Sequence, residues 1–323
     1  MALRNAIDAG MLITLATKGV IPCKGYGGIE RQVDWLATEL VKQGHRVVLV
    51  AGPGSSHPLC EVRHAVDDAE CRAAIPRDTQ IVHLHAWKVE VPFPTLNTER
   101  GHLPDYPRPQ PNWSFISARH AQLHGRKTFV YNGFPVDDYR PAKSKNDRLL
   151  FMAAIARAGK GLNRAVDLAR KFDFALDIAG GSRWKLLGRS QTRREGVFFK
   201  SLSRRYRFDG VVDGEEKLRL LGQSKAFLNP IAWEEPFGNA PVEAMLCGTP
   251  VLTTAYGALP ETVDADTGRF FESDGEFARG FAEIADLCAH KCRESAADRF
   301  PIAKTAKAYL ELYARILDGE ALP

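Results

Sequence analysis

Two glutamates, Glu235 and Glu243, are the residues of this sequence whose spacing points most clearly to chemistry. Proline, glycine and small residues separate them, and a helix-like run follows, so we expect Glu235 on a loop and Glu243 about one turn into a helix. A carboxylate can chelate the vicinal diol of a ribose, and the N–H groups at a helix start favour an anion. The arrangement therefore predicts a site for a sugar nucleotide.

The residues around this pair add to its specificity. A glutamate pair at this spacing occurs by chance in many helices, and the alternative interpretation is a charged helix start followed by a buried strand. Here Pro236-Phe237-Gly238 follows the first glutamate, and residues 243–251 read Glu-Ala-Met-x-x-Gly-x-Pro-Val. The stretch resembles the glutamate–seven-residue–glutamate motif of the family 4 retaining glycosyltransferases. The resemblance, which runs from Tyr26 to about Phe271, implies the GT-B fold: two doubly wound, Rossmann-like α/β domains facing across a cleft.

The resemblance also implies roles for the motif. Glu243 would bind the ribose hydroxyls, and Glu235 would hold donor-sugar hydroxyls or stabilise positive charge on the anomeric carbon. Retaining enzymes of this kind lack an obvious protein nucleophile, and the implied reaction is front-face attack in which the departing phosphate takes the acceptor proton. Electrostatic support for the leaving diphosphate then carries much of the catalysis, in contrast to the carboxylate pair of a glycosidase. Backbone amides that would contact sugar and phosphate belong to Phe237, Gly238, Asn239 and Ala240.

A glycine pair, Gly27 and Gly28, lies between a predicted strand and a predicted helix. Glycine lets the backbone approach a ligand closely, and the helix N-terminus that follows favours negative charge. The spacing is not that of the dinucleotide-binding fingerprint, and a tight turn is the alternative interpretation. Tyr-Gly-Gly-x-Glu-Arg at residues 26–31 is similar to the first loop of the family. The resemblance implies that both glycines face the donor diphosphate or the transferred sugar.

Two histidines, His83 and His85, end another predicted strand. Their period-two spacing puts both imidazoles on one face of the sheet. A zinc pair is an alternative, but no acidic residue or third histidine lies close in the sequence. In the family the second histidine of this pattern contributes to the donor-sugar site. The resemblance therefore assigns a catalytic role to His85, and we expect His83 to be structural.

A lysine that precedes a helix, Lys160, is suited to binding a phosphate. Lys160-Gly161 matches the Lys-Gly of the family, but Ala153-Ala154-Ile155 replaces the Gly-Arg that usually comes earlier in this loop. The usual phosphate-binding arginine is therefore missing or moved. Arg157 is our first candidate to supply the guanidinium, and Arg183 is the second.

The composition is that of a soluble globular protein, with 45% hydrophobic and 26% charged residues in 323. No apolar run approaches the roughly 20 residues needed to span a bilayer, and the N-terminus does not read as a signal peptide. Six cysteines lack disulfide or zinc-ribbon spacing, so we expect a reduced, cytoplasmic protein. Cys288 and Cys292, with His290 between them, are read as ordinary thiols rather than a metal site. Asp264-Ala265-Asp266 is likewise read as a loop rather than a metal motif, and no cofactor is predicted.

The positive charge is concentrated in one segment. Residues 183–207 hold nine basic residues and one acid, so this segment alone has a net charge of +8. The whole chain has a net charge of +5, so the remaining residues together carry about −3. One interpretation is a solvated helix and loop face. The other is contact with nucleotide phosphates, an anionic membrane surface or a polyanionic acceptor.

Apolar runs alternate with helical patterns in both halves of the chain, which predicts parallel sheets covered by helices on both faces. We expect an acceptor-binding domain over residues 1–140 and a nucleotide-sugar-binding domain over residues 147–300, with a final helix at about 302–318 that packs back on the first domain. The proline-rich segment 89–111 is read as a long loop. Predicted strands cover residues 11–16, 46–51, 79–85, 113–117, 128–131, 149–154, 174–179, 226–230 and 250–253, and predicted helices cover residues 30–43 and 162–172.

The resemblance therefore implies a retaining, metal-independent glycosyltransferase. The donor would be a UDP-sugar or a GDP-sugar, and the acceptor a small glycan, a lipid-linked sugar or a natural product. A membrane-peripheral position is one further expectation, and a polyanionic acceptor such as modified DNA is a minority one. The alternatives are a non-catalytic sugar-nucleotide-binding partner subunit, an epimerase, or a phosphorylase, although the covalent lysine cofactor signature of a phosphorylase is not found.

Overall fold

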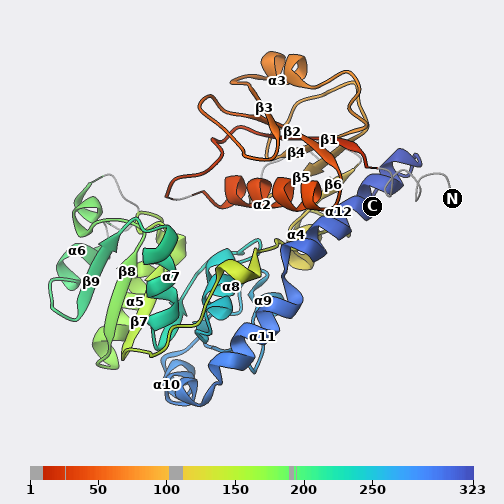
Figure 1. Cartoon of the computed structure of the whole chain (residues 1–323). Coiled ribbons are helices and arrows are strands. Elements are labelled where there is room, and N and C mark those ends of the chain that lie inside the picture. Colours follow the sequence, from red (N-terminus) through yellow and green to blue (C-terminus); the bar gives the residue numbers. More distant parts are fainter. Residues whose placement is uncertain (1–9, 26, 102–111, 189–192, 194) are drawn as a thin grey trace. The chain divides into compact units, whose positions relative to one another are not determined.

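The computed structural model describes residues 10–25, 27–101, 112–188, 193 and 195–323. The chain divides into two compact units, and the first is made from two separate stretches of sequence. Unit 1 comprises Met1–Pro135 with Phe300–Pro323, and unit 2 comprises Val136–Arg299. Figure 1 shows both units coloured along the chain.

Within its described residues, unit 1 holds a six-stranded parallel sheet in the order β3-β2-β1-β4-β5-β6. Among the residues described, four α-helices accompany it, of which α2 is 15 residues long. The strands are β1 (Leu12–Thr17), β2 (Arg46–Ala51), β3 (Glu61–His64), β4 (Ile81–His85), β5 (Thr95–Thr98) and β6 (Trp113–Ser114). The helices are α2 (Gly28–Lys42), α3 (Asp68–Ala74), α4 (Ala118–Leu123) and α12 (Ile302–Leu317).

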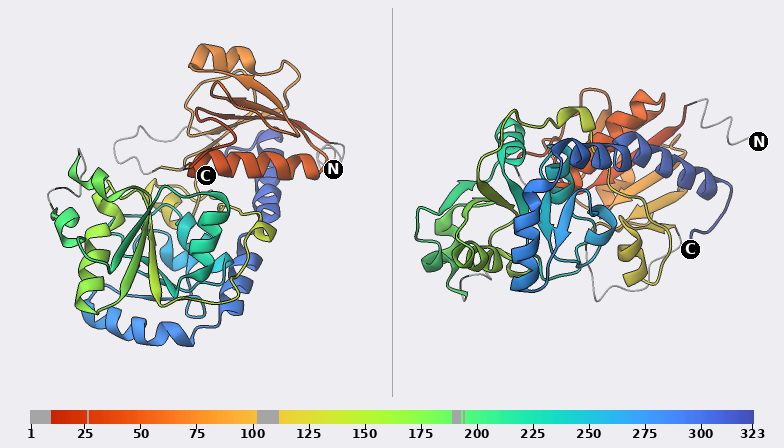
Figure 2. Two further views of the ribbon diagram at one scale, coloured as in Figure 1. Left: turned by 60° about the vertical axis from the view of Figure 1, so that its left-hand side comes forward. Right: turned by 90° about the horizontal axis from the view of Figure 1, so that it is seen from below.

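Both faces of this sheet are buried, which explains why its central strands read as unbroken apolar runs. Ile13 and Leu15 of β1 belong to a core that α2 and α12 complete. Ala16 of β1 and Val50 of β2 point to the opposite face, where they pack with Cys71 of α3. The views in Figures 1 and 2 agree that α2 and α3 lie on opposite sides of the sheet.

Unit 2 is built in the same way. Its described residues form a six-stranded parallel sheet in the order β12-β11-β10-β7-β8-β9. The helix α5 packs on one face with α10, through Leu162 and Val166 of α5 and Phe277 of α10. The strands are β7 (Arg148–Met152), β8 (Ala175–Ala179), β9 (Tyr206–Gly210), β10 (Ala226–Asn229), β11 (Val251–Thr253) and β12 (Gly268–Phe270). The helices are α5 (Leu162–Lys171), α6 (Val197–Lys200), α7 (Gly214–Gln223), α8 (Asn239–Leu246), α9 (Leu259–Thr262), α10 (Asp274–Glu283) and α11 (Ala289–Arg299).

Both sheets follow the doubly wound order of dinucleotide-binding folds. Counting strands from the start of each unit, the order is 3-2-1-4-5-6 in both, so the winding reverses between β1 and β4 in unit 1 and between β7 and β10 in unit 2. Ligands of such sheets bind beyond the carboxyl ends of the strands at this reversal. The predicted motifs follow these four strands or end them, which makes the two reversal points the places to look for a site.

The predicted fold class, two doubly wound α/β domains, is confirmed, but several elements differ from the sequence prediction. The strand predicted at 128–131 is wrong, because this segment makes only an isolated bridge between Phe129 and Phe115. The long loop predicted at 89–111 is interrupted by β5, whose Leu96 is buried in the core. Residues 102–111 of that segment lie outside the described residues. The strands β3, β9 and β12 were not predicted, since short strands at or near a sheet edge carry little apolar sequence.

Candidate functional site

The reversal point of unit 2 brings Glu235 and Lys160 together. The Nζ atom of Lys160 lies 2.7 Å from Oε2 of Glu235, and both side chains are largely buried. The indole N–H of Trp233 donates to the same oxygen at 2.8 Å. Nζ of Lys160 also lies 4.4 Å from the centre of the Trp233 ring, within the range of a cation–π contact. A carboxylate, a cation and an aromatic face are thus assembled at one point.

The topology accounts for this meeting. Lys160 ends the loop that follows β7, and Glu235 lies in the loop that follows β10, and these two strands are neighbours in the sheet. The backbone of Glu235 is held tightly, because the amide of Ala258 donates to its carbonyl oxygen at 2.8 Å. Gly257 makes this approach feasible: it has φ +63°, and a Cβ there would lie 2.2 Å from the nitrogen of Glu235.

The second glutamate of the pair, Glu243, has different partners. It lies in α8, one turn after Asn239, and its side chain is almost fully buried. Its Oε1 atom accepts a hydrogen bond from the hydroxyl of Tyr139 at 2.9 Å and lies 2.5 Å from Nζ of Lys217 in α7. A ribose that binds to this carboxylate would therefore meet a glutamate already neutralised by a lysine.

The start of α8 has the conformation of an anion-binding helix end. Gly238 precedes the helix with φ +93°, and no side chain caps this N-terminus. Asn239 and Ala240 are the first helical residues, and the positive end of the helix dipole lies at this turn. Phe237 is buried and anchors the loop that leads into the helix.

The two candidate arginines of the phosphate site are placed differently. Arg157 is exposed in the loop between β7 and α5 and forms no ion pair within the described part of the chain. Arg183 is engaged: its guanidinium lies 4.8 Å from the ring centre of Phe208 and donates to the carbonyl oxygen of Tyr206 at 3.0 Å. Ile155, in the segment where the family usually has its arginine, is fully buried. The geometry thus favours Arg157 as the residue able to reach a diphosphate.

We therefore expect Arg157→Ala to weaken the binding of a nucleoside diphosphate about tenfold, the loss typical of one charge-assisted contact. Thermal stability should stay unchanged, because the side chain is exposed. Arg183→Ala is the matched control: it should lower the free energy of unfolding by about 1 kcal/mol through the lost contacts and leave the affinity unchanged. Titration calorimetry and thermal unfolding measure the two effects. Weaker binding by the Arg183 variant alone would reverse the assignment.

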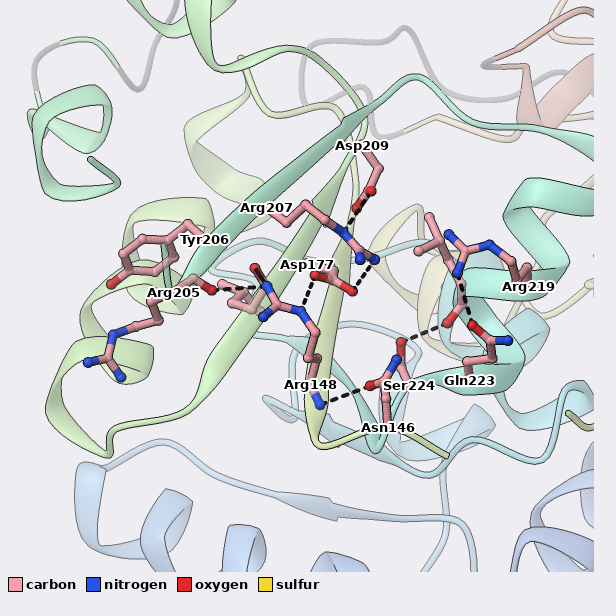
Figure 3. Close-up of polar contacts among 12 residues, drawn as sticks. Asn146, Arg148, Asp177, Arg205, Tyr206, Arg207, Asp209, Arg219, Gln223 and Ser224 are labelled. Atoms are coloured by element: carbon pink, nitrogen blue, oxygen red, sulfur yellow. Dashed lines mark hydrogen bonds and ion pairs between the residues drawn. The ribbon is translucent and has the colours of Figure 1, made fainter. Parts of the chain in front are cut away.

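Three basic residues of the segment 183–207 form ion pairs with acids of unit 2. The guanidinium of Arg207 lies 2.6 Å from the carboxylate of Asp177 in β8 and 3.0 Å from that of Asp209. Arg148 also pairs with Asp177, which is fully buried (Figure 3). Lys200 lies 3.1 Å from Asp167. Arg205 similarly pairs with Asp173. Arg189 and Arg194 lie outside the described residues. The charge of this segment therefore serves the fold of unit 2 more than the sequence suggests, which weakens the argument for a polyanionic acceptor.

In unit 1, the glycine pair lies at the start of α2, after the loop that follows β1. Gly27 precedes the helix and Gly28 is its first residue. A Cβ on Gly27 would lie 2.0 Å from Sγ of Cys23 and 2.9 Å from Oε2 of Glu30. Close packing against these two side chains thus requires glycine at position 27, whether or not a ligand binds there.

His83 and His85 lie on one face of β4, as their spacing predicts, with ring centres 3.8 Å apart. His83 is fully buried, and both its nitrogens have partners: Nδ1 lies 2.6 Å from the hydroxyl of Tyr313 in α12, and Nε2 lies 2.7 Å from Oγ1 of Thr98. His83 therefore holds β4, β5 and α12 together.

His85 has one nitrogen paired and one unpaired. Nη2 of Arg100 lies 3.1 Å from its Nδ1 atom. A guanidinium only donates hydrogen bonds, so Nδ1 must be the acceptor and the proton of the neutral ring sits on Nε2. Nε2 is buried and has no hydrogen-bond partner among the described residues. His85 thus presents an N–H donor that no residue in the described ranges satisfies.

Arg100 is a residue that the sequence did not single out. It lies two residues after the end of β5, is buried, and donates to Oδ1 of Asn132 at 2.6 Å as well as to His85. Its guanidinium has no carboxylate in an ion pair within the described part of unit 1. Burial, the His83 ring and the Arg100 cation together hold the pKa of His85 well below its usual value. The carboxyl ends of β4 and β5 therefore carry a neutral imidazole next to a buried cation.

Neither of the candidate metal motifs forms a ligand cluster. Among the described residues, no group of three or more histidine, cysteine or acidic side chains is placed to hold a metal ion. Asp264 instead pairs with Arg299 at 3.1 Å and accepts from Ser295. Cys288 is exposed while Cys292 is buried, and all six cysteines are free thiols. No helix in the described ranges combines the length and hydrophobicity needed to cross a bilayer.

Comparison with known families matches residues 146–287 to the model described as glycosyl transferases group 1. This range lies within unit 2 and contains Lys160, Glu235 and Glu243. No curated protein sequence matches the chain significantly.

The chain is also similar to solved structures of glycosyltransferases. AviGT4, a glycosyltransferase involved in avilamycin A biosynthesis, is 24% identical with a TM-score of 0.82, over 97% of this chain and 100% of that one. A glycosyltransferase from Rickettsia africae is 16% identical with a TM-score of 0.74, over 96% and 100%. HepE of Anabaena, solved with UDP and glucose, is 14% identical with a TM-score of 0.71, over 93% and 98%. The chain therefore has the two-domain α/β fold of the GT-B glycosyltransferases.

Proposed function

We propose that this protein is a retaining, metal-independent glycosyltransferase of family 4 that moves a sugar from a nucleoside-diphosphate donor to an acceptor hydroxyl. The observation that carries the proposal is the contact between Lys160 and Glu235 at the reversal point of unit 2. It places a cation for the diphosphate beside a carboxylate for the donor sugar, within the segment that matches the glycosyl transferases group 1 model.

In this proposal unit 2 binds the nucleotide. Glu243 accepts the ribose hydroxyls, and Lys217 moves from it or stays as a second ligand of the ribose. Lys160, Arg157 and the first amides of α8 bind the diphosphate. A UDP-sugar is the preferred donor and a GDP-sugar the second choice. The complex of HepE with UDP and glucose supports a UDP donor.

Unit 1 would bind the acceptor and supply His85 for the donor sugar. His85 would donate from Nε2 to a sugar hydroxyl, with Gly27 and Gly28 close to the diphosphate or the sugar. The acceptor would be a glycan, a lipid-linked sugar or a natural product. The involvement of AviGT4 in avilamycin A biosynthesis and of WaaG in lipopolysaccharide biosynthesis supports these classes. The free thiols support a reducing compartment, the cytoplasm.

The reaction would need no protein nucleophile. The acceptor oxygen attacks the anomeric carbon on the face that the phosphate leaves, the bond to the phosphate oxygen breaks, and that oxygen takes the acceptor proton. Lys160, Arg157 and the helix terminus stabilise the charge that builds on the diphosphate. Glu235 stabilises the positive charge on the sugar. Basic groups thus take the place that a metal ion has in other sugar transferases.

The first experiment is a thermal-shift panel of UDP, GDP, ADP, CDP and dTDP, each with and without magnesium. We expect one diphosphate to raise the unfolding temperature equally in both conditions, because binding to the folded state alone stabilises it. The sugar nucleotide of that base is then tested for transfer, and NMR of the product gives the anomeric configuration.

Other outcomes separate the alternatives. Binding without turnover on any acceptor would indicate a non-catalytic partner subunit, and conversion of the donor alone would indicate an epimerase. A shift that requires magnesium, or an inverted product, would overturn the mechanism. No shift with any diphosphate would overturn the proposed nucleotide site.

A further inference from the structure

Unit 2 exposes a group of large apolar side chains around α6. Trp184 is 73% exposed, Phe199 71%, Leu202 56% and Leu187 40%. Trp184 and Leu187 belong to the short 3₁₀-helix Arg183–Leu187. Phe199 lies in α6, and Leu202 lies two residues after its end. We call these four side chains the α6 surface. Helix α6 lies beside β9, one of the two edge strands of the sheet (Figure 1).

The α6 surface rests on a well-packed base. Leu186 and Val197 are fully buried in the core of unit 2, and Phe198 packs against that core. The Phe198 ring centre lies 5.6 Å from that of Trp184 and 5.3 Å from that of Phe199. The apolar residues of this segment thus divide into a set that faces the core and a set that faces outward, and the outward set is held in place by the inward one.

The basic residues of the same segment divide in the same way. Arg183, Lys200, Arg205 and Arg207 have partners within unit 2. Lys185, Arg193 and Arg204 are exposed and form no ion pair with any described residue. The acid of the segment, Glu195, is partly buried. Glu195 has no ion pair among the described residues either. Three exposed cations against one partly buried acid leave a positive surplus, and it belongs to the segment that carries the α6 surface.

We propose that the α6 surface binds an anionic lipid bilayer. Tryptophan, phenylalanine and leucine beside lysine and arginine is the composition of helices that lie in the membrane interface. Each basic residue near an anionic leaflet contributes electrostatic attraction, and the aromatic rings insert at headgroup level. The exposed apolar side chains and the three exposed basic residues together indicate a partner with an apolar interior and a negatively charged surface. The proposal does not depend on the glycosyltransferase reaction.

The test is co-sedimentation of the full chain with vesicles, compared between phosphatidylcholine alone and equal parts of phosphatidylcholine and phosphatidylglycerol. We expect binding to the anionic vesicles only, with a decrease at high salt. The double variant Trp184→Ser/Phe199→Ser should bind about tenfold more weakly, and so should the triple variant Lys185→Gln/Arg193→Gln/Arg204→Gln. The matched control Leu59→Ser/Val66→Ser removes two exposed apolar side chains of unit 1 and should change nothing.

Trp184 also reports its own environment. Its fluorescence, taken as the difference between the wild type and Trp184→Phe, should shift to shorter wavelength when anionic vesicles are added. Thermal unfolding shows whether each variant is folded before its binding is interpreted.

Three results would overturn the proposal. The first is no binding to anionic vesicles by the folded wild type. The second is a loss of vesicle binding in the triple charge variant while Trp184→Ser/Phe199→Ser still binds as the wild type does. That result would indicate electrostatic adsorption without insertion of the apolar side chains. The third is concentration-dependent dimerisation that Trp184→Ser/Phe199→Ser abolishes, because the surface would then cover a second copy of the chain.

Discussion

Replacing Glu235 with glutamine should lower kcat by about 100- to 1,000-fold, the loss typical of removing one preorganised electrostatic group from a transition state. The charge that the carboxylate stabilises develops on the sugar only during transfer, so kcat should fall far more than the affinity for the donor. Glutamine keeps the shape of the side chain and still accepts the Trp233 N–H bond through its amide oxygen. The measurement is steady-state transfer with the nucleotide sugar that the thermal-shift panel identifies.

The effect of this variant on folding must be separated from its effect on catalysis. Glu235→Gln leaves Lys160 without its counter-ion in a largely buried position, so the free energy of unfolding should fall. Lys160→Met on the same background removes the orphaned cation and should restore stability without restoring activity. A folded Glu235→Gln enzyme with wild-type kcat would contradict the role of the carboxylate, and it would leave the diphosphate site untouched.

The fold was readable from the sequence because its central strands obey one simple rule. Residues 46–51 and 174–179 are nearly continuous apolar runs. Such runs are typical of strands in a parallel sheet that is covered on both faces. The final helix, expected at about 302–318, forms as α12 over Ile302–Leu317. Glu61–His64, by contrast, is a strand of four polar or half-exposed residues at the sheet edge. Neighbouring β2 imposes its conformation, and no local pattern predicts that.

The site was only partly readable for a similar reason. Lys160 and Glu235 lie in loops whose motifs predict proximity to a ligand, and the sheet order brings them together. Lys217 lies within a helix whose exposed face is rich in charge, so nothing in its neighbourhood marks it as the partner of Glu243. Tyr139 is 104 residues from that carboxylate. Such partners follow from tertiary packing, which residue spacing does not encode.

Replacing Arg100 with methionine should make catalysis pH-dependent in a range where the wild type is insensitive. In the wild type, burial, His83 and the Arg100 cation all lower the pKa of His85, so the ring stays neutral through the physiological range. Removing the cation removes one of these causes. The pKa of His85 then rises, and activity should begin to fall at a higher pH than in the wild type as the solution is acidified. Loss of the hydrogen bond to Nδ1 also frees the other tautomer.

The combined loss should be about 10- to 100-fold in kcat/KM at neutral pH, the range for removing a group that orients a functional histidine. Arg100→Lys keeps a cation and a donor, so its pH profile should stay close to that of the wild type. Tyr313→Phe is the matched control, because it removes the partner of His83 Nδ1 without touching His85. It should cost stability and leave the profile flat. An Arg100→Met enzyme that is slower but has an unchanged pH profile would mean that Arg100 supports the fold of unit 1 and does not set the protonation of His85.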